Sequence, residues 1–322
     1  PPKHPGRPPR MLSESLHHVL LSAPLFLLIL VGYAITRFGR WPPEAADLMS
    51  KFVFYVLVPA LLFDTMSRFS QLPPVDARLL IAFFGSCIVV FLLGRLIGWK
   101  LFRLDGVSQS VFGVGCIFSN NVFLGIPLAK ATLGEASLPS VSLVVAFNAL
   151  ILWTLVTLSV EWSQHGSLSL RGFAKMAKSV LTNPIVVAIA AGLLFDASGL
   201  AMPRVLAQPI DMLAHSASPM ALVVLGMGLA KFGFKAGWRE GSVVTLIKLA
   251  VQPAVVWGLA RLLDLPPLET RSIVMLASIA VGFNVYLMAN QFKRMESAIA
   301  SATVLSTLFA AITTPVAIAL SQ

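Results

Sequence analysis

The sequence is poor in charged residues, since Asp, Glu, Lys and Arg together make up 12% of its 322 residues. Typical soluble domains contain about 25%. Hydrophobic residues make up 57% of the chain. The composition therefore excludes an ordinary soluble domain and indicates an integral membrane protein, whose main partner is the lipid bilayer.

Cysteines and catalytic motifs are also scarce. Cys87 and Cys116 lie in apolar runs without further metal-ligand residue types beside them, so we interpret both as packing residues. The sequence contains no His-Glu-x-x-His, no Gly-x-Ser-x-Gly and no Gly-x-x-x-x-Gly-Lys-Ser/Thr motif. We therefore expect neither an enzyme nor an ATP-driven pump, and no metal or other cofactor.

The basic residues give a formal net charge of +10. They stand at the ends of apolar runs and form no contiguous basic stripe, so a nucleic-acid partner is not expected. Residues 1–10 are rich in proline and basic side chains and precede Met11. We interpret them as a non-native or disordered leader outside the fold.

Ten apolar runs are long enough to approach the roughly 20 residues that a transmembrane helix needs. They cover about residues 19–36, 51–67, 78–102, 107–132, 139–161, 173–195, 205–231, 242–263, 268–291 and 297–320. The connections are short, which leaves no room for a separate soluble domain. The chain thus divides into two halves of five spans, residues 11–165 and 166–322.

The distribution of Lys and Arg predicts the orientation. The connections and span ends on one side hold fourteen basic residues, namely Arg37, Arg40, Lys51, Arg95, Lys100, Arg103, Arg171, Lys175, Lys178, Lys231, Lys235, Arg239, Lys293 and Arg294. The other side holds six, namely Arg68, Arg78, Lys130, Arg204, Arg261 and Arg271. The richer side is expected in the cytoplasm. Both termini should therefore lie outside, and the segment 163–172 should face the cytoplasm.

The fourth run contains a sequence that opposes a continuous helix, at residues 119–127. Pro127 lacks an N–H group, and Gly125 lowers the helix preference of the same turn. Backbone groups freed inside a bilayer need protein, water or a solute as partners. Asn120 and Asn121 add two amides that point in different directions. We expect a binding site with these four residues; the alternative is a packing kink with hydrogen bonds between helices.

The second half repeats this arrangement. Pro59 precedes Asn120 by 61 residues, and Pro219 precedes Asn284 by 65. Gly282 and Asn284 lie near the centre of the ninth run. An odd number of spans in each half makes the repeat inverted, and paired interrupted helices are typical of a transport site. The predicted fold is an all-α integral membrane protein with ten transmembrane helices as two inverted five-helix repeats, broken helices 4 and 9 crossing at the midplane.

The stretch Asn-Asn-Val-Phe-Leu-Gly-Ile-Pro-Leu-Ala-Lys at residues 120–130 resembles the fourth-helix motif of the auxin efflux carrier family. Weaker similarities occur at residues 58–63, 218–220, 225–226 and 282–289, and at Lys248, Pro253, Thr307 and Pro315. The resemblance covers nearly all of the chain after Met11.

This resemblance implies ten helices with both termini outside, a scaffold of helices 1, 2, 6 and 7, and a mobile transport domain of helices 3–5 and 8–10. Substrate would bind where the two broken helices cross. Bacterial members of the family are regarded as carriers of small carboxylates such as malonate and malate, and plant members export auxin. Many members carry a proline in the ninth helix where this chain has Ala280 and Val285, which leaves Gly282 and Asn284 to permit the second break.

Two charged residues lie within apolar runs. Asp64 is a candidate for coupling to a proton or a sodium ion, although an ion pair with Arg68 at i+4 is the favoured interpretation. Lys248 could attract a substrate carboxylate. Because a long lysine side chain can extend to the interface, we favour that simpler role for it.

Two further residues could act on charge near the outer side. Lys130 could receive anions there or anchor the helix at the interface. His215 lies at i+4 from Asp211 and could serve proton coupling, although a structural pair is favoured. The serines and threonines of the last run, including Thr303, Ser306 and Thr307, are expected to bond to their own backbone.

The sequence therefore predicts a secondary transporter of small organic anions, mono- or dicarboxylates such as malonate or malate, that uses elevator-type alternating access in the plasma membrane. The sequence leaves open coupling to H⁺ or Na⁺ and the formation of a homodimer. An uncoupled facilitator or exporter of a weak organic acid is the alternative within the same class. A membrane receptor or scaffold without transport is the alternative from another class.

Overall fold

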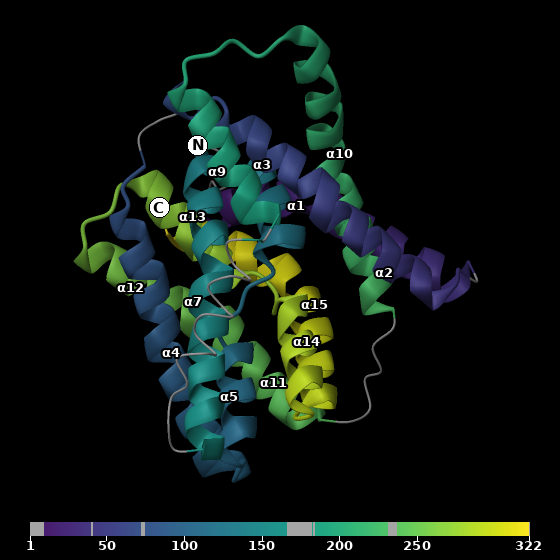
Figure 1. The fold of residues 1–322 in the computed structure, drawn as a ribbon. Helices are drawn as coiled ribbons and strands as arrows, with labels where there is room; N and C mark the ends of the chain where they lie inside the picture. The colour runs from purple at the N-terminus through teal and green to yellow at the C-terminus, as the bar shows by residue number, and fades with distance from the viewer. Residues whose placement is uncertain are drawn as a thin grey trace, which may run out of the picture.

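The computed structural model describes residues 10–39, 41–71, 75–165, 182, 184–230 and 237–321, and within them all regular secondary structure is helical (Figure 1). This confirms the expected all-α class. Residues 1–9, most of the predicted leader, lie outside the described part, and so does 166–172 of the predicted cytoplasmic segment. Arg10, the last residue of the predicted leader, begins the first helix.

The α-helices and the short π and 3₁₀ segments follow one another along the chain as follows: α1 (Arg10–Phe38), α2 (Pro43–Phe52), η1 (Val53–Leu57), α3 (Val58–Met66), η2 (Phe69–Gln71), α4 (Arg78–Phe102), α5 (Gly106–Gly115), η3 (Asn121–Gly125), α6 (Ile126–Thr132), η4 (Glu135–Ser137), α7 (Leu138–His165), α9 (Pro184–Ala197), α10 (Arg204–Leu229), α11 (Trp238–Leu246), η5 (Ile247–Val251), α12 (Gln252–Leu262), α13 (Pro267–Ser278), α14 (Phe283–Phe292) and α15 (Glu296–Leu320).

Several of these helices have the length and apolar character of membrane spans. In the described residues, five helical stretches qualify: Glu44–Met66, Arg78–Phe102, Arg204–Leu229, Trp238–Leu262 and Glu296–Leu320. Two shorter apolar helices cover Ala23–Phe38 and Pro184–Ala197. The chain is therefore a multi-pass membrane protein.

Three π-helical turns interrupt the helices in the described part of the chain, and each is followed by a proline at the second position of the next α-helix. In each, the residue before the proline donates its N–H to a carbonyl five positions back. The pairs are Val58 with Val53, Ile126 with Asn121, and Gln252 with Ile247. A proline ring clashes with the carbonyl one turn earlier, and an extra residue in that turn relieves the clash.

The helices pack in two groups. In the first, α10 packs on α1 and α3, and α3 packs on α9. The second group contains α4, α5, α7 and the helices from α11 to α15. The groups meet where α1 contacts α15 and α6 and where α10 contacts η3. Figure 1 shows α14 and α15 side by side, and α4 beside α5 and α7.

Within the first group, α1 and α10 touch at two glycines. A Cβ atom on Gly32 would lie 1.9 Å from the carbonyl oxygen of Val223, and a Cβ on Gly226 would lie 1.9 Å from that of Ile29. The two backbones are thus in direct contact, as small residues allow between membrane helices. Any larger side chain at either position would force these helices apart.

Candidate functional site

Two helices are interrupted by short extended segments. The first break separates α5, which ends at Gly115, from η3, which begins at Asn121. The second separates α13 from α14; Ile279 and Gly282 have extended backbone there, with ψ values of 168° and 141°. The sequence predicted both breaks. The second forms without a proline, in agreement with the expectation that Gly282 permits it.

The two breaks lie against each other as a single antiparallel bridge between Ser119 and Val281. The Asn120 N–H donates to the Ala280 carbonyl oxygen at 2.9 Å, and the Gly282 N–H donates to that of Phe118 at 2.8 Å. A Cβ on Gly282 would lie 3.0 Å from the Ser119 carbonyl oxygen and from the Phe118 ring. Glycine therefore favours this close approach, because any side chain would press on both neighbours.

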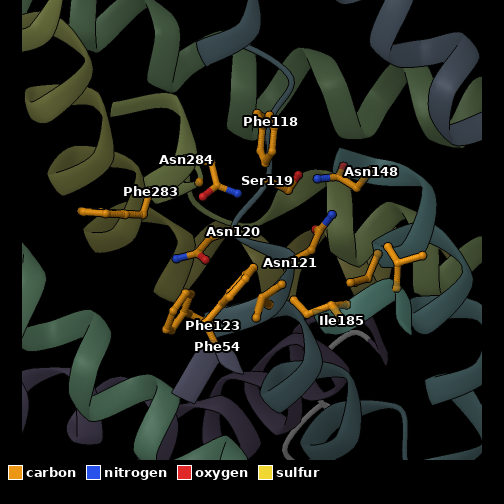
Figure 2. Close-up of a pocket in the computed structure, with 14 residues that line it drawn as sticks. Phe54, Phe118, Ser119, Asn120, Asn121, Phe123, Asn148, Ile185, Phe283 and Asn284 are labelled. Carbon is orange, nitrogen blue, oxygen red and sulfur yellow. The ribbon is translucent and has the colours of Figure 1, made fainter. Parts of the chain in front are cut away.

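A small cavity of about 50 Å³ surrounds the crossing. It is lined by residues from η1, η3, α7, α9, α14 and both breaks: Phe54, Phe118, Ser119, Asn120, Asn121, Val122, Phe123, Val145, Asn148, Ile185, Val186, Gly282, Phe283 and Asn284. Figure 2 shows the asparagine side chains gathered around the point where the two breaks cross. The lining is neutral and combines amides with apolar and aromatic side chains.

Several buried polar atoms at this cavity have no hydrogen-bond partner. They are Ser119 Oγ, Asn120 Nδ2, Asn121 Nδ2, Asn121 Oδ1 and Asn148 Oδ1. A buried polar group without a partner costs about 1–3 kcal/mol. So many of them at one small cavity are typical of a site that is completed by water or a ligand.

The structure brings together four of the six predicted binding residues, Asn120, Asn121, Gly282 and Asn284. Gly125 and Pro127 are not among the residues that line this cavity. Instead, a Cβ on Gly125 would lie 2.9 Å from Leu276 Cδ2, so this glycine allows α13 to pack closely. Pro127 is buried at the start of α6, where it shapes the π turn. Neither residue therefore lines the cavity at the crossing, and their part in substrate binding stays a prediction.

Asn148, in α7, was not predicted from the sequence. It is 6% exposed and reaches the cavity from the side opposite to the second break (Figure 2). Its only sequence signal is that it is the single amide in a long apolar run. Ser119 and the aromatic residues Phe54, Phe123 and Phe283 were likewise missed, because such residues are common in apolar helices that have no site.

A larger cavity of about 480 Å³ shares Phe54, Phe123, Phe283 and Asn284 with the small one. Its far lining includes Asp47, Ser50 and Lys51 from α2, together with residues of α10. The three phenylalanines therefore stand between the crossing and a wider, partly charged space.

Three of the charged candidates line a different cavity of about 320 Å³: Asp64, Lys130 and His215. Each has a partner of opposite charge type. Asp64 pairs with Arg68, Lys130 Nζ lies 3.2 Å from Glu135 Oε1, and His215 Nε2 lies 3.3 Å from Asp211 Oδ1. The favoured pairs for Asp64 and His215 are confirmed. None of the three lines the cavity at the crossing.

Lys248 does not extend to the interface, so that prediction is wrong. Its side chain is fully buried, and Nζ donates to the carbonyl oxygen of Ala277 in α13. The carbonyl groups at the end of a helix lack partners within the helix, and this one offers Lys248 a nearby acceptor.

The distant ends of the two broken helices are also connected. Asp105 caps α5 by accepting the Ser108 N–H at 2.9 Å, and its carboxylate lies 3.4 Å from Arg294 Nε, just after α14. Burial opposes ionisation of this carboxyl, but the bonds from Ser108 and the charge of Arg294 outweigh it and hold the pKa of Asp105 below its usual range. In the described residues, no group of three or more His, Cys, Asp or Glu could hold a metal ion.

Comparison with known proteins identifies relatives of the same length. The chain is 28% identical over 299 residues, 91% of its length and 92% of the relative's, to the "Putative malonate transporter" of Rhizobium meliloti. It is 24% identical over 290 residues, 88% of its length and 92% of the relative's, to an "Uncharacterized transporter" of Methanocaldococcus jannaschii. A second "Uncharacterized transporter", of Methanothermobacter thermautotrophicus, is 22% identical over 295 residues, 90% and 94% of the two chains.

These relatives are transporters by name, not enzymes, receptors or scaffolds, and the family model described as "Membrane transport protein" matches residues 18–318. That match extends from α1 to α15 and includes both breaks. The chain therefore belongs to the membrane transport protein family, which is the auxin efflux carrier family that its fourth-helix motif resembles.

Proposed function

We propose that this transporter moves small organic anions, mono- or dicarboxylates such as malonate or malate, and binds them at the crossing of the two breaks. The observation that carries the proposal is the set of unpartnered buried polar atoms on Ser119, Asn120, Asn121 and Asn148. An occupant with several oxygen atoms would supply their missing partners. The malonate transporter name of one relative supports this substrate class.

Helix ends favour an anion at this place. The N-terminal ends of η3 and α14 both begin at the crossing, and the first N–H groups of a helix carry a partial positive charge. The cavity lining contains no carboxylate that would repel an anion. Amide donors from Asn120, Asn121 and Asn284 would complete the recognition of a carboxylate.

The architecture that goes with this function has ten spans in two inverted halves, residues 11–165 and 166–322. Helices 4 and 9 are the broken ones, α5–η3–α6 and α13–α14. Helices 1, 2, 6 and 7 form the scaffold and helices 3–5 and 8–10 form the transport domain that moves as an elevator. The packing of α10 on α1 and α3, and of α4 on α5, supports this division.

The crossing is closed in this structure. A cavity of about 50 Å³ has room for a few water molecules, whereas typical ligand pockets measure about 300 Å³ or more. Movement of Phe54, Phe123 and Phe283 would join it to the larger cavity near Lys51. On the positive-inside rule, that side is cytoplasmic and both termini are outside the plasma membrane.

The proposal includes coupling of transport to H⁺ or Na⁺ through Asp64. His215 and Lys130 line the same cavity of about 320 Å³. An uncoupled facilitator or exporter of a weak organic acid is the alternative. Exposed apolar side chains of α4, such as Leu92 and Trp99, would contact lipid or, in a homodimer, a second copy of the chain.

Counterflow in liposomes tests the function. Purified protein is reconstituted with unlabelled malonate inside, and uptake of labelled malonate is measured. We expect internal malonate to accelerate uptake, and excess external malonamide, a neutral analogue of similar size, not to compete. The proposal would be overturned if malonate and a panel of other mono- and dicarboxylates were all taken up no faster than by protein-free liposomes.

A further inference from the structure

Two side chains on one helix each donate a hydrogen bond to the backbone beside one of the two breaks. Lys248, in η5, donates from Nζ to the carbonyl oxygen of Ala277. Gln252, four residues later at the start of α12, donates from Nε2 to the carbonyl oxygen of Ile117 at 2.9 Å. Both side chains are fully buried. Neither is among the residues that line the cavity at the crossing.

The two acceptors stand at equivalent places. Ala277 is the last residue but one of α13, directly before the second break, and Ile117 lies between the end of α5 and the bridging Ser119. Carbonyl groups at a helix end lack partners within the helix and must find them elsewhere when buried. Lys248 and Gln252 supply such partners at both breaks.

The second break also has side-chain hydrogen bonds from another helix. The Ser278 carbonyl accepts from Thr314 Oγ1 at 2.8 Å, and the Val281 N–H donates to Ser306 Oγ at 2.9 Å. Both partners come from α15. These bonds hold the second break alone, whereas the pair on η5 and α12 connects it to the first.

Lys248 lies within the π turn η5, and Gln252 directly follows that turn. The ion pairs among the described residues do not include Lys248. Thr245, which precedes Lys248 on the same helix, is also buried, but its Oγ1 donates to the Gly241 carbonyl at 2.8 Å and to the Ala302 carbonyl of α15 at 3.4 Å. Thr245 thus offers a matched buried polar side chain that contacts neither break.

We propose that Lys248 and Gln252 are positioning residues that hold the two breaks in register, so that the crossing moves as one unit. Their role in substrate binding rests on the proposed function, but their effect on the crossing itself does not. Removing either side chain leaves a buried carbonyl unpaired next to a break and loosens the backbone bonds of Asn120 and Gly282.

Hydrogen exchange of the full-length protein in detergent tests this directly. Lys248→Met and Gln252→Leu keep the approximate size of each side chain and remove its donor. An unpaired buried acceptor corresponds to about 5-fold to 150-fold in an opening equilibrium. We therefore expect exchange at the Asn120 and Gly282 N–H groups to accelerate by that factor in both variants, and the dissociation constant for malonate to rise.

Thr245→Val is the control and should leave exchange at both N–H groups unchanged. Equal acceleration in this control, or unchanged exchange in either of the two test variants, would overturn the proposal. Two variants are used so that one remains if the other does not fold. If the wild-type protein binds no carboxylate but exchange still responds, the proposed function fails and the positioning role stands.

Discussion

The backbone N–H of Asn120 donates to the carbonyl oxygen of Ala280 at 2.9 Å, which joins the two helix breaks at the residue whose side chain also enters the cavity. Backbone and side chain of Asn120 therefore have separate roles. The first holds the crossing, and the second leaves Nδ2 without a hydrogen-bond partner inside the cavity.

Replacing Asn120 with alanine is expected to weaken substrate binding. A hydrogen bond to a charged group contributes roughly 1.5–3 kcal/mol, so the dissociation constant should rise by about 10-fold to 150-fold. Asn290→Ala, an exposed asparagine on α14, is the control and should change little. The dissociation constant and the melting temperature are measured on the same samples; a normal dissociation constant with a lower melting temperature would make Asn120 purely structural.

Asn148 offers a test of substrate charge. Asn148→Asp places a carboxylate in a neutral lining, and two like charges a few ångströms apart repel by about 4 kcal/mol at an effective dielectric constant near 20. Binding of malonate should be at least about tenfold weaker than in Asn148→Ala, and should recover in part at low pH as the new carboxyl is protonated. Equal affinities in the two variants would show that the substrate charge lies elsewhere.

Gly282 is expected to tolerate no side chain. Gly282→Val would place atoms against the Ser119 carbonyl and the Phe118 ring, so transport should fall by at least about tenfold, the effect of roughly 1.4 kcal/mol at the crossing. Gly228→Ala is the control, since a Cβ there meets nothing within 4 Å. Uptake is compared at equal amounts of folded protein. Full activity of Gly282→Val would mean that the close approach is not required.

Asp64→Asn is expected to leave malonate binding intact and to change the pH or sodium dependence of uptake, because it removes one of the carboxylates that line the cavity of about 320 Å³. Uptake is measured over a pH series with and without sodium. Arg68→Gln breaks the same ion pair while keeping the acid. If both variants retain the wild-type ion dependence, Asp64 serves only as the partner of Arg68.

Orientation can be measured with cysteine labels. Leu200→Cys, in the exposed connection before α10, should react with an impermeant thiol reagent in intact cells, and Lys100→Cys, at the end of α4, only after lysis. The native Cys87 and Cys116 are buried and give a low background. The reverse pattern would place the termini in the cytoplasm.

The sequence predicted the two breaks well because their causes are local. Pro127 and Gly125 disfavour a continuous helix wherever the chain places them, and the amides beside them mark a polar site. It did not show the packing role of Gly125, since the close approach to Leu276 appears only when α13 is in place.

Asn148 and Lys248 show where prediction from sequence stops. An isolated asparagine in an apolar run is equally compatible with a bond between helices, so only the packing of α7 on the crossing reveals its place. For Lys248, the length of its side chain suggested that it extends to the membrane interface. The carbonyl that Lys248 contacts belongs to another helix. That carbonyl can accept a hydrogen bond because its helix is broken nearby, and the sequence predicts the break but not the direction in which the carbonyl points.

The π turns also bear on how the length of this chain can change. Each turn holds one residue more than an α-helical turn, so a single-residue deletion there could be absorbed by conversion to an α turn. The residues after the deletion would then keep roughly their places around the helix axis, because an α turn with one residue fewer covers about the same rotation. A deletion between Lys248 and Gln252 would thus leave Gln252 on the side that faces Ile117, whereas a deletion in a regular α-helical stretch would rotate the following residues by about 100°. Single-residue deletions in these turns would therefore preserve contacts between helices that the same deletions elsewhere in a helix would break.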